Sequence, residues 1–180
     1  MCYRYIALSD NLTGNPRDSE WVLAEPLRNL EMDRRGHVGC ITLFAPTETP
    51  ILHLPGGGML LGDLYDEDGR PVNDLANLQH LSTQSALRQH LLDCYWGEYL
   101  LFQPAEESID SATLMRDPSG GVACAYSLQD SNGFITSNLA IASSLGLHYD
   151  RIDWDFVHHC LIYPHMKTSR TGLASVVLQS

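Results

Sequence analysis

The chain has 180 residues, 44% of them apolar, and a formal net charge of −11, which is typical of one globular domain with its own core. The acidic balance argues against a nucleic-acid or anionic-membrane binder, because phosphate groups carry the same charge. No apolar run is long enough to span a membrane. Five dispersed cysteines without a CxxC pair predict reduced thiols in the cytoplasm, and apart from Cys2 we expect them to be small buried hydrophobes.

The first half of the chain is predicted to form short strands and then helices. Composition rich in β-branched and aromatic residues predicts strands over residues 3–9, 39–46, 51–54 and 58–65. Leucines at helical intervals between residues 73 and 96 predict helices, the second of which has Ser82 as its N-cap.

Strands and helices follow in the same order in the second half. Strands are predicted over residues 97–104, 111–118, 122–129 and 133–137, and helices over 138–147 and 153–163. The Asn132-Gly133 pair predicts a hairpin turn, because both residues tolerate positive φ. Trp96 and Tyr99 are expected to pack in the core or on a sheet. Consecutive hairpins with segregated helices favour an α+β architecture with antiparallel sheets.

Two kinds of site are excluded by residue type and spacing. Gly57 and Gly62 have the spacing of a phosphate-binding loop, but Asp63 stands where that loop requires lysine. The adjacent pair His158 and His159 lies in a predicted helix, where neighbouring side chains point about 100° apart and rarely share a metal ion. We therefore expect neither a nucleotide nor a metal site in these segments.

A set of motifs in a fixed order resembles the amino-terminal domain of the asparagine synthetase family. These motifs are "GDLYDEDG", "WGEYLLF", "LMRDPSGG", "GFITSNLAIASSLGL" and "DWDFVHHCL". The resemblance implies a class II glutamine amidotransferase-like domain over residues 1–180. It also implies the four-layer αββα fold of the amino-terminal nucleophile (Ntn) hydrolases, with two antiparallel sheets flanked by helices. In this family Arg116, Asp117 and Gly120 form a structural turn.

Within that family the chain is most similar to the macrolactam synthetases of lasso peptides, which form an isopeptide bond. The similarity is carried by "YIALSD" and by "DWDFVHHCLIYPHMKTSRTGLASV". It implies that a carboxy-terminal synthetase domain, with ATP and Mg²⁺, activates an acidic side chain of a precursor peptide. We expect that domain, the precursor peptide and a leader peptidase as partners, and neither nucleic acid nor membrane.

The glutamine site of the family is only partly matched. Cys2 is a candidate nucleophile if Met1 is removed, because its own α-amine then serves as base. Leu61-Gly62-Asp63 stands where the family has Asn-Gly of the oxyanion hole, and losing one such donor costs about 100- to 1000-fold in rate. Thr83-Gln84 stands where a carboxylate should bind the substrate amine. Arg34 and Arg35 do not complete the family's Arg-Gly-Pro segment.

Three hypotheses follow. The first is a non-hydrolysing, scaffolding domain of a peptide macrocyclase, because ring closure uses the amine of the peptide and needs no ammonia. The second is a Cys2-dependent glutaminase that supplies ammonia to an asparagine synthetase. The third is a non-catalytic module that binds a peptide or a protein.

Overall fold

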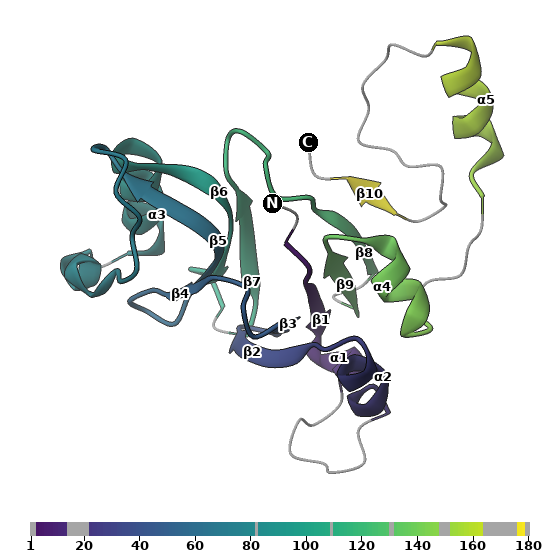
Figure 1. Ribbon diagram of the computed structural model, residues 1–180, viewed down its shortest axis with the longest axis horizontal. Coiled ribbons are helices and arrows are strands. Elements are labelled where there is room, and N and C mark those ends of the chain that lie inside the picture. Colours follow the sequence, from purple (N-terminus) through teal and green to yellow (C-terminus); the bar gives the residue numbers. More distant parts are fainter. Residues whose placement is uncertain are drawn as a thin grey trace.

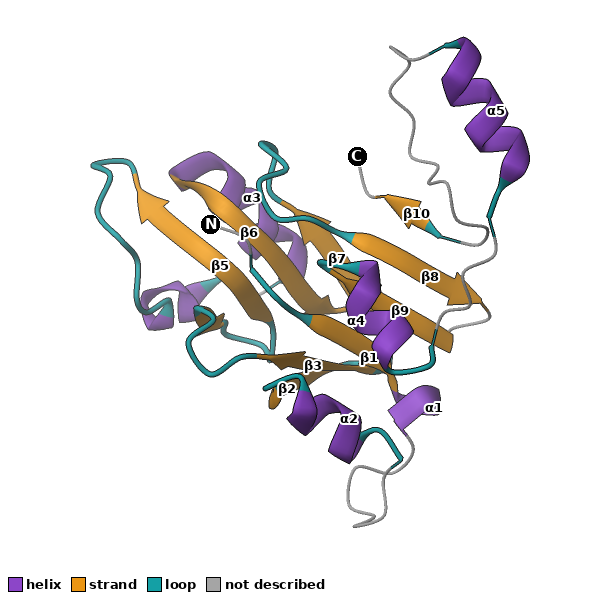
Figure 2. Cartoon of the chain, turned by 45° about the vertical axis from the view of Figure 1, so that its right-hand side comes forward, coloured by secondary structure: helices purple, strands orange, loops and turns teal. Residues whose placement is uncertain are grey.

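The protein consists of two antiparallel sheets with helices on their outer faces (Figures 1 and 2). The computed structural model describes residues 3–13, 22–81, 83–108, 110–129, 132–147, 152–163 and 176–178. The prediction of an α+β protein with two antiparallel sheets is confirmed. No helix within these described residues is long and apolar enough to cross a membrane.

The larger sheet has six strands and draws on both ends of the chain. Its order is β10 (Val177–Leu178), β8 (Ala125–Gln129), β9 (Asn132–Thr136), β1 (Ile6–Ser9), β3 (Ile41–Ala45) and β2 (Asp33–Val38). Strand β1 lies inside the sheet, since Ile6 pairs with Phe44 of β3 and with Thr136 of β9.

The predicted hairpin between β8 and β9 is present, but its turn is shorter than expected. Gln129 pairs with Asn132, so Asn132 and Gly133 belong to strand β9 and do not form the turn. The connecting residues 130–131 lie outside the described residues. Gly133 has a φ of 151°, and a Cβ there would lie 1.9 Å from the Ser127 carbonyl oxygen, so glycine is needed for close strand pairing.

The smaller sheet has four strands that follow one another in the sequence. They are β4 (Ile51–His53), β5 (Met59–Asp66), β6 (Tyr95–Pro104) and β7 (Ala112–Arg116). The two longest strands pair along their length, from Met59 with Phe102 to Asp66 with Tyr95. Between them in the chain lie the 3-10 helix η1 (Ala76–His80) and helix α3 (Gln84–Cys94).

Three hydrophobic clusters show how the layers pack. One lies between the sheets, where Tyr5 and Leu43 on the side of the larger sheet pack with Leu61 and Phe102 of the smaller sheet. A second lies on the outer face of the larger sheet, against α2 (Ala24–Asn29) and α4 (Leu139–Ser144). The third lies on the outer face of the smaller sheet, where leucines of η1 and α3 cover alternate residues of β5 and β6.

Helix ends follow capping chemistry, with one difference from the prediction. Thr83, and not Ser82, is the N-cap of α3, because its hydroxyl accepts a hydrogen bond from the Ala86 amide. Asn138 caps α4 and Asp153 caps α5 (Trp154–Ile162) in the same way.

Helix α5 stands apart from the sheets in both views (Figures 1 and 2). It has no buried residue, and Trp154 and Leu161 are 69% and 77% exposed. The short helix α1 (Asp10–Thr13) follows β1 directly. Among the described cysteines only Cys124 is buried, so the expectation of burial is wrong for Cys40, Cys94 and Cys160, which are half-buried.

Candidate functional site

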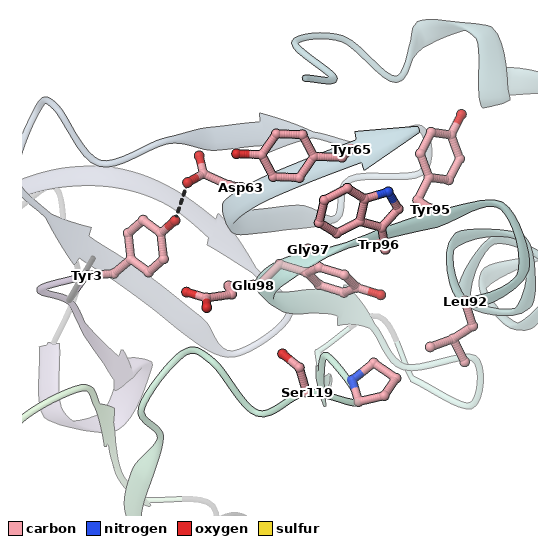
Figure 3. A pocket seen from close by; sticks show the side chains of 11 residues that line it. Tyr3, Asp63, Tyr65, Leu92, Tyr95, Trp96, Gly97, Glu98 and Ser119 are labelled. Atoms are coloured by element: carbon pink, nitrogen blue, oxygen red, sulfur yellow. Dashed lines mark hydrogen bonds between the residues drawn. The ribbon is translucent and has the colours of Figure 1, made fainter. Parts of the chain in front are cut away.

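The principal cavity lies at the end of β5 and β6 that extends past β7. It has a volume of about 660 Å³ and opens between the strand ends, the end of α3 and the turn after β7 (Figure 3). Its lining residues are Tyr3, Asp63, Tyr65, Leu92, Tyr95, Trp96, Gly97, Glu98, Tyr99, Pro118 and Ser119. A cavity of this size and composition, mostly apolar with a few polar groups, is typical of a binding site.

Asp63 is held by the residue that follows Cys2 in the chain. The Tyr3 phenol donates a hydrogen bond of 2.5 Å to Oδ2 of Asp63 (Figure 3). Burial of Tyr3, and then this bond to the carboxylate, raise the pKa of the phenol well above its usual range. Tyr3 is therefore a neutral donor at physiological pH, and its side chain is buried in the cluster between the sheets.

A second carboxylate faces the same cavity. Glu98 of β6 is the cross-strand partner of Asp63 on β5, so both side chains project from one face of the sheet. Asp63 is half-buried and Glu98 is exposed, and no lysine, arginine or histidine is among the described residues that line the cavity. Glu98 has room because Gly121 lacks a side chain, since a Cβ there would lie 2.4 Å from Cγ of Glu98.

Two aromatic rings form a shelf next to the carboxylates. Tyr65 and Trp96 are also cross-strand partners, and their rings stack with centroids 4.8 Å apart. The indole N–H of Trp96 donates to the Asp66 carbonyl over 2.9 Å, which fixes the orientation of the ring. Trp96 is nevertheless 56% exposed, so the expectation that it packs in the core or on a sheet holds only for its contact with Tyr65. Tyr99 is buried.

The turn after β7 forms the opposite wall and is held by Arg116 and Asp117. The buried Asp117 carboxylate accepts hydrogen bonds from the Tyr99 amide at 3.2 Å and the Gly120 amide at 2.9 Å. The Arg116 guanidinium donates to the Val122 carbonyl at 2.8 Å and to the Gly120 carbonyl. These charge-assisted bonds fix a rigid loop, and Gly120 supplies its positive φ of 68°.

The residues expected around the glutamine site have different surroundings. Leu61 is fully buried between the sheets and offers the cavity no donor. Gly62 is in the middle of β5, and Asp63 lines the cavity. Cys2 lies outside the described residues, so the nearest described position is Tyr3.

Thr83 and Gln84 do not join Asp63. Gln84 lies at the other end of β5, where it donates to the Gly56 carbonyl at 3.3 Å and accepts from Gln103 at 2.8 Å. Its neighbour Thr83 caps helix α3. Arg34 and Arg35 are on β2 of the larger sheet, where Arg35 donates to the Pro46 carbonyl. None of these four residues lines the cavity.

Sequence reasoning missed Tyr65, Trp96 and Glu98 as site residues. A signal was present, because "DLY" and "WGE" each place side chains on one face at a spacing of two. The register that brings the two segments together could not be known from that spacing.

Metal chemistry has no support in the described part of the chain, where no group of three histidine, cysteine or acidic side chains could hold an ion. His158 and His159 are on α5, and the His159 ring contacts Tyr163. Comparison of the chain with models of protein families and with curated proteins finds no match. The cavity itself therefore carries the functional argument: it offers carboxylates and aromatic surface, which suit binding of a cationic group.

Proposed function

We propose that this chain is a glutamine amidotransferase-like domain of the asparagine synthetase family, with the αββα fold of Ntn hydrolases. In this proposal it serves a macrolactam synthetase of lasso peptides as a scaffold and hydrolyses no glutamine. The bond-forming chemistry, with ATP and Mg²⁺, belongs to a synthetase domain that is its partner.

The contact between Tyr3 and Asp63 carries the proposal. In a working glutaminase of this kind the space beside the nucleophile must admit the substrate amide. Here the phenol of Tyr3 lies against the Asp63 carboxylate at 2.5 Å and is itself only 6% exposed. The adjacent Leu61 is turned into the core, so its side chain cannot stabilise an oxyanion. Both observations support a domain of this family that does not hydrolyse glutamine.

The packing of the layers is the second support. Helices cover the outer faces of two stacked antiparallel sheets, and β1 begins close to the amino terminus inside one of them. This order of layers is compatible with the proposed fold.

The first experiment measures glutamate release from glutamine by protein whose amino terminus has been verified by intact mass. We expect no release above the level of a Cys2→Ala variant. Release that disappears in Cys2→Ala would overturn the proposal and favour the glutaminase that supplies ammonia.

The second experiment measures ring closure with the complete natural protein, ATP, Mg²⁺ and precursor peptides encoded beside it. Macrolactam formation removes one water from the peptide, which intact mass detects. We expect Cys2→Ala to close the ring at the wild-type rate. Absence of any ring product with every neighbouring peptide would leave the binding module as the better description.

A further inference from the structure

The edge of strand β6 is open beside the cavity. Strand β7 pairs with β6 only from Leu100 to Pro104. One residue earlier, the backbone of Tyr99 is taken by Asp117, whose amide donates to the Tyr99 carbonyl at 3.1 Å and whose carboxylate accepts from the Tyr99 amide. Beyond that point β7 has turned away, and β6 continues for four more residues.

Gly97 offers the next pair of backbone groups on this edge. Backbone direction alternates along a strand, so the N–H and C=O of Gly97 point to the same side as those of Tyr99. The backbone of its cross-strand partner Leu64 points away from β6, because the Leu64 carbonyl accepts a hydrogen bond from the Val72 amide at 2.8 Å. Leu64 therefore leaves the backbone N–H and C=O of Gly97 without a partner on β5. Among the described residues, no group outside strands β5 and β6 forms a hydrogen bond with the Gly97 backbone. A donor and an acceptor thus line the cavity in the geometry of a strand edge.

The side chains around this edge specify what kind of strand would fit. Trp96 and Tyr65 form an exposed aromatic shelf on one face of the sheet, and Asp63 and Glu98 lie next to it on the same face (Figure 3). Leu92 and Pro118 also line the cavity and add apolar surface to it. A residue that projects toward the shelf meets two carboxylates and an indole face, which together favour a lysine or arginine side chain.

We propose that an extended peptide segment carrying a lysine or arginine adds to the edge of β6 at Gly97. Its backbone pairs with the N–H and C=O of Gly97, and its cationic side chain lies over Trp96 toward Asp63 and Glu98. Strand addition of this kind gives affinity through the main chain and specificity through alternate side chains. The inference deepens the proposed function, because it names where that function would hold a peptide, and its test is separate.

The first test uses wild-type protein and three short peptides in isothermal titration calorimetry. The reference peptide is acetyl-Thr-Val-Lys-Val-Thr-amide; one analogue replaces lysine by norleucine, and the other is N-methylated at both valines. We expect the norleucine analogue to bind about tenfold more weakly, because it keeps the stem and loses the charge-assisted contact. N-methylation removes backbone donors and should abolish binding.

The second test uses two variants with the same change of charge and a third that removes the indole. Glu98→Gln should weaken the lysine peptide about five- to tenfold and leave the norleucine peptide unchanged. The matched control is Glu107→Gln, an exposed position beyond the far end of β6, which should change neither. Trp96→Ala should weaken both peptides. Circular dichroism of each variant verifies that the fold is retained.

Specific results would overturn the inference. They are no binding of the lysine peptide, equal binding of the lysine and norleucine peptides, or full binding of the N-methylated analogue. Binding at this edge without ring closure would keep the site and remove the proposed macrocyclase function. If Glu98→Gln and Trp96→Ala left ring closure unaffected, the proposed macrocyclase function would stand and the peptide site at this edge would be ruled out.

Discussion

At the scale of single residues, Tyr3 shows how one side chain changes the chemistry of a site. Its phenol donates a hydrogen bond to Asp63, and burial together with that carboxylate raises the pKa of the phenol. Burial also raises the pKa of Tyr5, and burial with the Asp117 charge raises that of Tyr99. These phenols bind their protons more tightly in the folded state than in the unfolded chain.

This difference predicts loss of stability at alkaline pH. A phenol whose pKa is raised on folding contributes stability that is fully present below about pH 10 and is lost as the pH rises toward the folded value. Tyr3→Phe should lower the free energy of unfolding at pH 7 by about 1 kcal/mol, through loss of the bond to Asp63. It should also make the decline above pH 10 shallower. Urea unfolding at several pH values measures both effects.

Tyr65→Phe is the control for this experiment, because it keeps the ring stacked on Trp96 and leaves the bond between Tyr3 and Asp63 in place. Equal alkaline slopes for wild type and Tyr3→Phe would show that the Tyr3 phenol does not carry the effect.

At the scale of elements, glycines decide how closely strands approach. Gly62 on β5 has a φ of 118°, and a Cβ there would lie 2.2 Å from the Glu98 carbonyl oxygen on β6. The nearest atom belongs to the backbone, so it cannot move aside without disturbing the pairing. Gly146, after helix α4, has a φ of 69° and open space around a Cβ.

These two glycines give a matched prediction. Gly146→Ala should cost about 1 kcal/mol, the price of a left-handed conformation for alanine. Gly62→Ala adds a steric clash in a sheet and should cost at least about 3 kcal/mol. Chemical denaturation of the two variants compares them directly. Similar losses would mean that β5 and β6 can separate locally at little cost.

A second pair of variants tests which helices belong to the core. Leu91 of α3 is fully buried, and Leu161 of α5 is 77% exposed. Leu91→Ala should lower the free energy of unfolding by about 2–5 kcal/mol, and Leu161→Ala by less than about 0.5 kcal/mol. A large loss at Leu161 in denaturant titrations would show that α5 packs against the protein in solution.

The sequence could predict most elements and only part of the site. Local patterns indicated β5, β6 and the helices α4 and α5, because alternation and helical periodicity are local properties. Strand β2 was missed because its residues are mostly polar and give no strand pattern. It is an edge strand that is held by its pairing with β3. Trp96 was misjudged because its exposure depends on where β7 stops, a long-range fact.

At the scale of the whole molecule, charge works against compactness. The net charge is −11, and the described ion pairs are His37 with Asp10, Arg70 with Asp68 and Arg88 with Glu106, all with at least one well-exposed partner. Such pairs contribute little, so self-repulsion is the larger electrostatic effect.

Salt should therefore stabilise the protein at pH 7. Raising NaCl to about 0.5 M shortens the screening length to a few ångströms and should increase the free energy of unfolding by about 1 kcal/mol or less. The same titration near pH 5, close to the calculated pI of 4.9, is the control and should show little change. A decrease in stability with salt at pH 7 would mean that attractive pairs dominate.

The strand order also has a consequence for biosynthesis. The smaller sheet is built from one continuous stretch, from β4 to β7, and can form as soon as that stretch has left the ribosome. Strand β1 precedes that stretch in the sequence but pairs with β9 on one side, so Ile6 meets Thr136 only after β9 has been synthesised. Until then the edge of β1 that faces β9 lacks its partner, so an apolar strand stays exposed and is a natural target for chaperones.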